Sequence, residues 1–423
     1  MLAVQCKEQR WRVLRMRISH RLSPSAIVWM LGASQIIGYG TIYYSFSILA
    51  EDIAKSLSVA TSWLYGSFSL ALLASAFLAP LIGRRIDRHG AAAVMAIGSG
   101  LCALTLLGAS LASGAISFTI MLVALQAAST LVLYDAAFAA LVQATDGEAR
   151  LRITHLTLIA GFASTLFWPL TSWLHGLLGW REVFAVFAAL NLFVCVPIHL
   201  LLAQQHHHAT TQAVAMDEES PSAQTEVSTL PAEKRRQGLW LLTIAFALSS
   251  FALSAVLAQM VPTLAALGLG SSALIVSTFF GPAQVLVRFV NMLLGVKRHP
   301  MTAALVAFAM LPLALLMLMA LAPMTLGGLL FVVLLGFGSG LKSIVQGTLP
   351  LALFGSGAYG ARLGIMAGAR QSLSALAPFA LAALISSIGP SLALVTVASV
   401  GVLGFGAVVM VARLQVTHRH GST

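Results

Sequence analysis

Long apolar stretches alternate with short polar connections along most of the chain. A helix needs ~20 mostly apolar residues to cross a bilayer, and twelve stretches reach that length. They lie near 26–50, 60–83, 91–111, 115–143, 153–178, 183–203, 238–266, 272–295, 301–321, 325–350, 361–387 and 391–412. The pattern predicts an all-α polytopic membrane protein with twelve transmembrane helices in two six-helix bundles.

A longer polar stretch divides the two sets of apolar stretches. We therefore expect a basic N-terminal tail over 1–25, a first bundle over 26–203, a linker over 204–237, a second bundle over 238–413 and a tail over 414–423. The linker lacks apolar periodicity, which is typical of a solvated segment. It contains His206, His207 and His208; three consecutive histidines can bind a metal, but we favour an incidental run and predict no metal site.

Composition supports the membrane interpretation. The chain is 59% hydrophobic and only 9% charged, against roughly 45–50% and 25% in soluble proteins. The net charge of +11 raises the alternative of nucleic-acid binding. The basic residues are sparse and fall between apolar runs, so we expect no nucleic-acid partner. Three cysteines without a pairing pattern predict no disulfide framework.

The basic residues predict the orientation of the helices. With the N-terminus inside, nineteen Lys and Arg side chains fall in cytoplasmic segments, and only Lys55 and Arg181 fall in outside connections. This asymmetry follows the positive-inside rule. The apolar run after the basic tail continues to about residue 50, so we interpret it as an uncleaved span rather than a signal peptide. We expect a bacterial-type inner (plasma) membrane protein with both termini cytoplasmic.

Four ionisable residues lie well inside predicted spans: Asp135, Arg288, Lys342 and Arg370. A charge in mid-bilayer costs from a few to more than ten kcal/mol, so each needs a partner or a watery cavity. Three cations against one carboxylate leave a positive excess that an entering anion would neutralise. Arginine binds carboxylates in bidentate fashion, which indicates a substrate-binding role for these cations.

Structural alternatives remain open for these residues. The long stem of Lys342 could carry its charge to the membrane surface. Asp135 and Arg370 could form a structural pair, or Asp135 could take part in coupling or gating.

Polar and aromatic residues could complete the site. Gln284, Arg288 and Asn291 follow one another at helical spacing and share one face, which we expect to line the pore. Tyr39 and Tyr43 share a face of the first helix, where a packed seam is the alternative to a ligand site.

A short basic turn between the second and third spans, Leu81-Ile-Gly-Arg-Arg-Ile-Asp-Arg-His-Gly90, resembles the signature of the major facilitator superfamily of secondary transporters. The matching positions are Gly83, Asp87, Arg88 and Gly90. The resemblance implies two six-helix bundles that alternate access to a central site. It also implies that Asp87 and the arginines latch the cytoplasmic side against the start of helix 11.

Within that superfamily the chain looks similar to the monocarboxylate and oxalate–formate branch, on the spacing from Trp63 to Arg88. The resemblance implies that Arg288 binds a substrate carboxylate. Two positions depart from the branch. Gln284 stands where an acidic residue is often linked to proton coupling, and Tyr43 and Tyr44 occupy the region where some members carry a basic residue.

These observations predict a secondary active transporter that moves a small organic anion, monocarboxylate-like, by alternating access. We expect no enzymatic activity and no cofactor, because no nucleotide-binding loop or nucleophile arrangement is visible. Expected partners are a small-molecule substrate, with a co-transported proton or exchanged anion, and the lipid bilayer, with the protein a monomer. Alternatives are an efflux pump for a drug-like or toxic molecule and a membrane sensor that binds ligand without moving it; the short tails argue against the sensor.

Overall fold

The computed structural model describes residues 22–145, 147–205, 228–295 and 299–419. The histidine run, most of the predicted linker, Lys297, Arg298 and most of the basic N-terminal tail lie outside the described residues. Among the described residues, eleven helices are long and apolar enough to cross a membrane. The last of them is broken at Gly389, whose φ of 81° interrupts the helical backbone, so the described chain crosses twelve times. The predicted all-α architecture is confirmed.

The first six crossings contain several interrupted helices. Their elements, in chain order, are α2 (Pro24–Tyr39), a π-helical turn (Gly40–Tyr44), α3 (Ser45–Ser56), α4 (Thr61–His89), α5 (Ala91–Ser110), α6 (Ala115–Ser129), α7 (Tyr134–Ala144), α8 (Ala149–Ala160), α9 (Ala163–Leu177), α10 (Trp180–Leu190) and a second π-helical turn (Asn191–Cys195) that leads on to Gln205.

The second six crossings include the two longest helices. Their elements are α12 (Ala232–Ala258), α13 (Met260–Leu264), a third π-helical turn (Ala265–Leu269), α14 (Ser272–Ser277), α15 (Phe280–Leu294), α16 (Pro300–Leu321), α17 (Thr325–Phe354) and α18 (Tyr359–Arg419).

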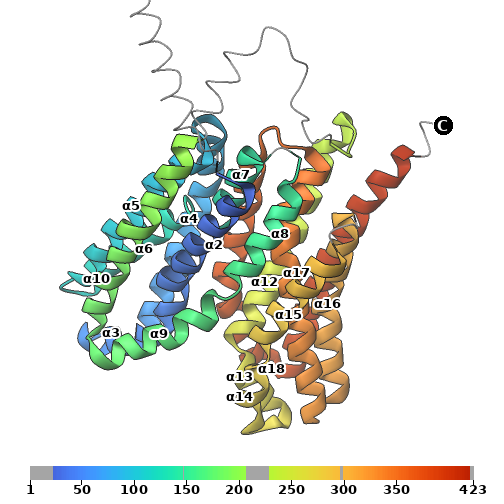
Figure 1. Ribbon diagram of the computed structural model, residues 1–423. Helices are drawn as coiled ribbons and strands as arrows, with labels where there is room; N and C mark the ends of the chain where they lie inside the picture. The colour runs from blue at the N-terminus through green and yellow to red at the C-terminus, as the bar shows by residue number, and fades with distance from the viewer. Residues whose placement is uncertain (1–21, 146, 206–227, 296–298, 420–423) are drawn as a thin grey trace, which may run out of the picture.

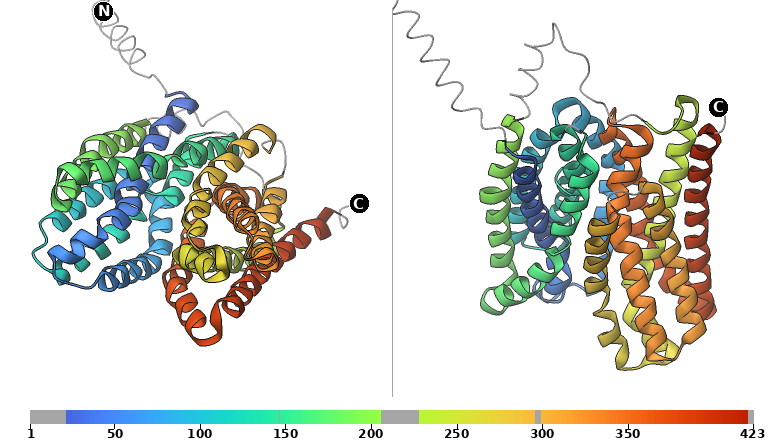
Figure 2. Two further views of the ribbon diagram at one scale, coloured as in Figure 1. Left: turned by 90° about the horizontal axis from the view of Figure 1, so that it is seen from below. Right: turned by 45° about the vertical axis from the view of Figure 1, so that its right-hand side comes forward.

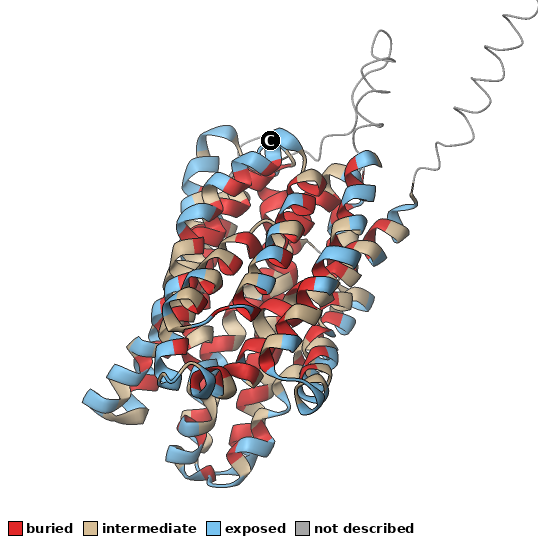
Figure 3. Ribbon diagram, turned by 90° about the vertical axis from the view of Figure 1, so that its left-hand side faces the viewer, coloured by how far each residue is buried: buried red, intermediate tan, exposed pale blue. Residues whose placement is uncertain are grey.

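The two halves stand side by side, α2–α10 on one side and α12–α18 on the other (Figures 1 and 2). Helix α2 begins and helix α18 ends at the same end of the molecule, the top of Figure 1, which we call the termini end. Buried residues face the interior of each half, and exposed residues lie on the outward faces (Figure 3). Large apolar side chains such as Phe77 (76% exposed) and Phe193 (73%) lie on these outward faces, as a bilayer requires.

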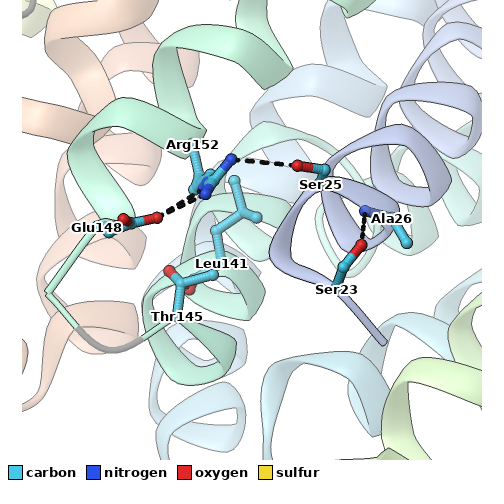
Figure 4. Close-up of polar contacts among 7 residues, drawn as sticks. All are labelled: Ser23, Ser25, Ala26, Leu141, Thr145, Glu148 and Arg152. Carbon is cyan, nitrogen blue, oxygen red and sulfur yellow. Dashed lines mark hydrogen bonds and ion pairs between the residues drawn. The ribbon is translucent and has the colours of Figure 1, made fainter. Parts of the chain in front are cut away.

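The first helix begins with local capping chemistry at the termini end (Figure 4). The Ser23 hydroxyl accepts a hydrogen bond from the Ala26 amide at 3.2 Å, and Pro24 supplies the preset backbone of the first helical position. Arg152 of α8 donates to Glu148 at 2.6 Å and to the Ser25 hydroxyl at 3.5 Å. The start of the fifth crossing is thereby tied to the start of the first.

One buried apolar cluster joins the two halves at the termini end. It contains Phe138 and Ile153 from the first half together with Leu351, Tyr359 and Leu363 from the second. The Tyr359 hydroxyl donates to the Gly347 carbonyl at 2.7 Å, so its polar end is satisfied within this cluster. The other three apolar clusters each stay within one half. The halves are therefore packed against each other mainly at the termini end.

Candidate functional site

The fourth crossing is broken in mid-helix, between α6 and α7. Gln35 of α2 is fully buried, and its amide nitrogen donates to the Val132 carbonyl in the break at 2.7 Å. This bond satisfies a backbone acceptor that the break leaves outside regular helix. The break places Asp135 in the first turn of α7, where the helix dipole favours a carboxylate.

Asp135 joins the two halves through both oxygens of its carboxylate. Its Oδ1 accepts a hydrogen bond from Gln346 Nε2 of α17 at 2.8 Å. Its Oδ2 pairs with Arg370 Nη2 of α18, also at 2.8 Å. The other terminal nitrogen of the Arg370 guanidinium, Nη1, is buried and has no partner among the described residues. One carboxylate thus bridges the halves and leaves one edge of the guanidinium unsatisfied.

This bridge lies in the wall of a cavity of about 290 Å³ between the halves. The polar part of the wall includes Asp135, Arg370, Gln346 and Gln371, and Gln371 accepts a hydrogen bond from Ser75 at 3.1 Å. Smaller hydroxyls, including Ser254, complete it. The cavity therefore combines one ion pair with several neutral hydrogen-bonding groups from both halves.

Tyrosines form an aromatic wall of the same cavity, with Tyr39, Tyr43 and Tyr134 among its lining residues. The ring centroids of Tyr39 and Tyr134 are 4.8 Å apart, and those of Tyr39 and Tyr43 are 5.9 Å apart. The π-helical turn inserts extra backbone just after Tyr39. As a result, the ring centroid of Tyr44 is also only 6.5 Å from that of Tyr39. The sequence-predicted tyrosine face therefore reaches the cavity, and its rings also pack on one another.

Arg288 takes a different place from Arg370. It is 6% exposed, its Nε donates to the Ser343 hydroxyl at 3.1 Å, and its guanidinium packs against Gly161, where the fifth crossing is broken. It is not among the residues that line the cavity, and the described residues give it no carboxylate partner within ion-pair distance.

The two residues predicted to flank Arg288 also lie outside that cavity. Gln284 donates to the Ser339 hydroxyl of α17 at 2.6 Å. Asn291 lines a second pocket, of about 490 Å³, with Thr154 and Thr348. Gln284 and Asn291 therefore do not line the central cavity with Arg370, although the sequence had predicted this for their shared face. Gln284 bonds to the neighbouring helix α17, and Asn291 lines the second pocket.

Lys342 is buried inside the second half and does not extend to the membrane surface. Its ammonium is 3.4 Å from the Ser249 hydroxyl and 3.3 Å from the Ser250 hydroxyl of α12, and the residue is 8% exposed. Within the described part of the chain no carboxylate pairs with it. Arg288 and Lys342 therefore add two buried basic side chains to the Asp135–Arg370 pair.

The signature between the second and third crossings contacts the start of α18. Asp87 accepts hydrogen bonds from the Gly360 amide at 2.8 Å and the Ala361 amide at 2.7 Å. Gly83 lies against the Gly360 backbone so closely that a Cβ atom there would overlap it. Gly90 turns the chain between α4 and α5 with a φ of 84°. Arg88 is exposed.

Several of these residues were not singled out from the sequence. Gln346 holds Asp135, Gln371 lines the cavity beside Arg370, and Ser343 and Ser339 hold the polar side chains of α15. For Gln346 and Gln371 the available signal was a side-chain amide inside an apolar span, which is costly to bury unless it is hydrogen-bonded. Among the described residues no group of three or more His, Cys, Asp or Glu side chains is placed to bind a metal ion.

Comparisons with known proteins agree with this architecture. The family model described as the Major Facilitator Superfamily matches residues 28–378. The human organic anion transporter MFSD10 (TETRAN) has a similar structure, with a TM-score of 0.67 and 15% identity over 90% of this chain and 98% of that chain. The proton:xylose symporter XylE, solved with 6-bromo-6-deoxy-D-glucose, gives a TM-score of 0.65 and 13% identity over 90% of this chain and 95% of that chain. No curated protein matches the sequence at a significant level.

The fold and the bridged cavity between two helical halves define a secondary transporter rather than an enzyme. The chain belongs to the major facilitator superfamily. It is a multi-pass membrane protein of a family that binds small-molecule substrates. The likeness to the two solved structures shows the fold alone, because the identities are low.

Proposed function

We propose that this transporter moves a small organic anion, monocarboxylate-like, by alternating access of the central cavity. The observation that carries the proposal is the unsatisfied edge of Arg370. Its Nη1 is buried without a partner among the described residues, in the wall of a cavity between the halves. A buried donor on a charged group is costly to leave unpaired, and a substrate carboxylate would satisfy it.

The charge balance of the described residues around the cavity supports the same conclusion. Arg288, Lys342 and Arg370 are largely buried basic side chains, and Asp135 is the carboxylate paired with one of them. Arg288 alone already leaves an excess positive charge. The net positive charge favours an anion over a neutral or cationic substrate. We assign the direct carboxylate contact to Arg370, with Tyr39 and Tyr43 against the apolar part of the substrate. Arg288 and Lys342 act through their charge, and Gln284 and Asn291 remain candidates for an outer part of the pathway.

Cavity size separates this proposal from drug efflux. The cavity holds about 290 Å³, at the lower limit of the 300–1,000 Å³ that is typical of ligand pockets. A small anion fits that volume, whereas a drug-sized molecule needs the larger part of the range. The volume therefore favours a small substrate over a drug-sized one.

We further propose that Asp135 couples transport to a proton or to an exchanged anion. Asp135 and the substrate carboxylate would share the Arg370 guanidinium, and the second negative charge would weaken the bridge between the halves when substrate binds. The contact of Asp87 with the start of α18 would gate the termini end, which we infer to be the cytoplasmic side of a bacterial-type inner membrane. We infer that the protein works as a monomer.

A thermal-shift screen of the purified protein against small carboxylates, sugars and cationic drugs tests the substrate class. A ligand at a hundred times its Kd stabilises the folded state by about 2.7 kcal/mol, which raises the unfolding temperature measurably. We expect carboxylates to stabilise the wild type and to lose that effect in Arg370→Lys, which keeps the charge but not the planar fork. Arg84→Lys, an exposed position on α4, is the matched control. Stabilisation by sugars or cationic drugs and not by carboxylates would contradict the proposal.

A further inference from the structure

A groove on the outer surface of the second half lies between α16 and the last part of α18. It is lined by Leu305, Val306 and Ala309 of α16 and by Phe405, Val409, Ala412 and Arg413 of α18, and encloses about 710 Å³. Six of the seven lining residues are apolar. This groove lies outside the pathway between the halves and needs its own explanation.

The two helices meet at one end of the groove and diverge toward the other. Gly401 of α18 lies against Leu311 and Pro312 of α16, where a Cβ atom would come within 2.9 Å of the Leu311 side chain. From that contact the groove opens toward the termini end, where Arg413 stands near the end of the last crossing. The groove therefore extends from near the Gly401 contact to Arg413, and we call the end at Arg413 its open end.

The length of the groove matches one half of a bilayer. Phe405 to Arg413 spans eight helical steps, or about 12 Å along the axis, and one leaflet contributes about 15 Å of the hydrocarbon core. Neighbouring side chains on the same helix face outward, with Leu403 64% exposed and Met410 50% exposed. The groove therefore opens onto the hydrocarbon of the leaflet at the termini end.

The charged residues at the open end indicate which chemical group of a bound molecule would lie there. Arg413 is exposed at the rim, and arginine binds phosphate oxygens in bidentate fashion. The Gln415 side chain donates to the Thr229 hydroxyl at 2.8 Å, so the end of α18 lies beside the segment that enters α12. The first turns of α12 contain three basic residues, Lys234, Arg235 and Arg236, and one acidic residue, Glu233. The basic residues at this end outnumber the acidic ones.

We propose that this groove binds a phospholipid with a net negative headgroup. One of its acyl chains would lie between α16 and α18, and its phosphate would lie at Arg413. A second copy of the protein is a less suitable occupant, because the groove offers no polar group along its length to orient a partner helix. An acyl chain has no polar groups and fits a groove that carries charge only at its open end.

Native mass spectrometry of the delipidated full chain, incubated with equal amounts of phosphatidylglycerol and phosphatidylcholine, tests the proposal. One basic residue near a membrane surface favours anionic lipid about fivefold. We expect the wild type to retain phosphatidylglycerol over phosphatidylcholine by at least that factor, and Arg413→Gln to lower the ratio about fivefold. Ala309→Phe, which fills the groove, should lower retention of both lipids. Arg85→Gln, an exposed arginine of α4 at the same end, should retain the wild-type ratio.

Two results would overturn the proposal. The first is an equal lipid ratio in the wild type and Arg413→Gln. The second is a dimer that Ala309→Phe dissociates without any change in lipid retention, since that would make a second copy the occupant. If Ala309→Phe does not fold, Ala309→Leu gives the same test with a smaller side chain.

Discussion

The contact between Asp87 and α18 makes a quantitative prediction about the opening of the termini end. Asp87→Asn keeps the size of the side chain but replaces one carboxylate oxygen with an amide NH₂. In the wild type both oxygens accept backbone amides, from Gly360 at 2.8 Å and Ala361 at 2.7 Å. The variant therefore loses one charge-assisted hydrogen bond and places a donor against a donor.

The size of the effect follows from the energetics of such bonds. A hydrogen bond to a charged group contributes about 1.5–3 kcal/mol, and the carboxylate also faces the positive end of the α18 dipole. A loss of about 2 kcal/mol shifts the balance between closed and open contacts about thirtyfold toward open. Because this contact joins α4 of one half to α18 of the other, its loss favours separation of the halves at the termini end.

Hydrogen–deuterium exchange read out by mass spectrometry measures the effect directly. Peptides that cover the start of α18 should exchange faster in Asp87→Asn by up to the same thirtyfold, while peptides from the middle of α16 should not change. Arg84→Gln, one turn earlier on α4 and likewise exposed, is the control and should behave like the wild type. Wild-type exchange at the start of α18 in Asp87→Asn would refute the assignment of Asp87 to this contact.

Three further predictions concern other contacts. Gly83→Val should disrupt the approach of α4 to Gly360, where even a Cβ atom overlaps the backbone, and should increase exchange at the start of α18 as Asp87→Asn does. Thr229→Val removes a 2.9 Å bond to the Ala352 carbonyl and the acceptor of Gln415; it should cost about 1–2 kcal/mol and lower Tm, whereas wild-type Tm would contradict it. Gln346→Leu removes one of the two partners of Asp135 and should weaken carboxylate binding in the thermal-shift assay, an unchanged response being the contrary result.

The sequence predicted the fold well, because the length of an apolar run is fixed by the thickness of the bilayer. It predicted the limits of helices less well. The span expected over 238–266 is a helix that begins at Ala232 and ends at Ala258, followed by a separate short helix from Met260. Hydropathy marks the part of a helix that lies in lipid, and the charged first turn of α12 extends beyond it.

The candidate site was predicted in its residue types rather than in its geometry. Buried charges were identifiable because each is costly in lipid, and the structure brings Asp135 and Arg370 together. Arg288 was favoured by a sequence resemblance to the monocarboxylate and oxalate–formate branch, yet the cavity is lined by Arg370. Which charge faces the cavity depends on how the helices rotate and where they break.

The helix breaks were the features that the sequence concealed. The interruption after Ser129 lies in a run of ordinary apolar and hydroxyl residues, with no Pro or Gly to signal it. The π-helical turn after Tyr39 likewise depends on tertiary contacts, among them the bond from Asn191 to the Thr41 hydroxyl at 3.1 Å. Both features arise from packing between helices, which periodicity along one helix does not record.

Uptake of a labelled small monocarboxylate into proteoliposomes tests the central claim most directly. Measurements under a proton gradient and under exchange against an internal carboxylate cover both modes of coupling. We predict saturable uptake by the wild type in at least one mode and a loss of about tenfold or more in Arg370→Lys, since one charge-assisted hydrogen bond is worth about that factor. Absence of carboxylate flux in both modes, or equal flux in the wild type and Arg370→Lys, would contradict the account.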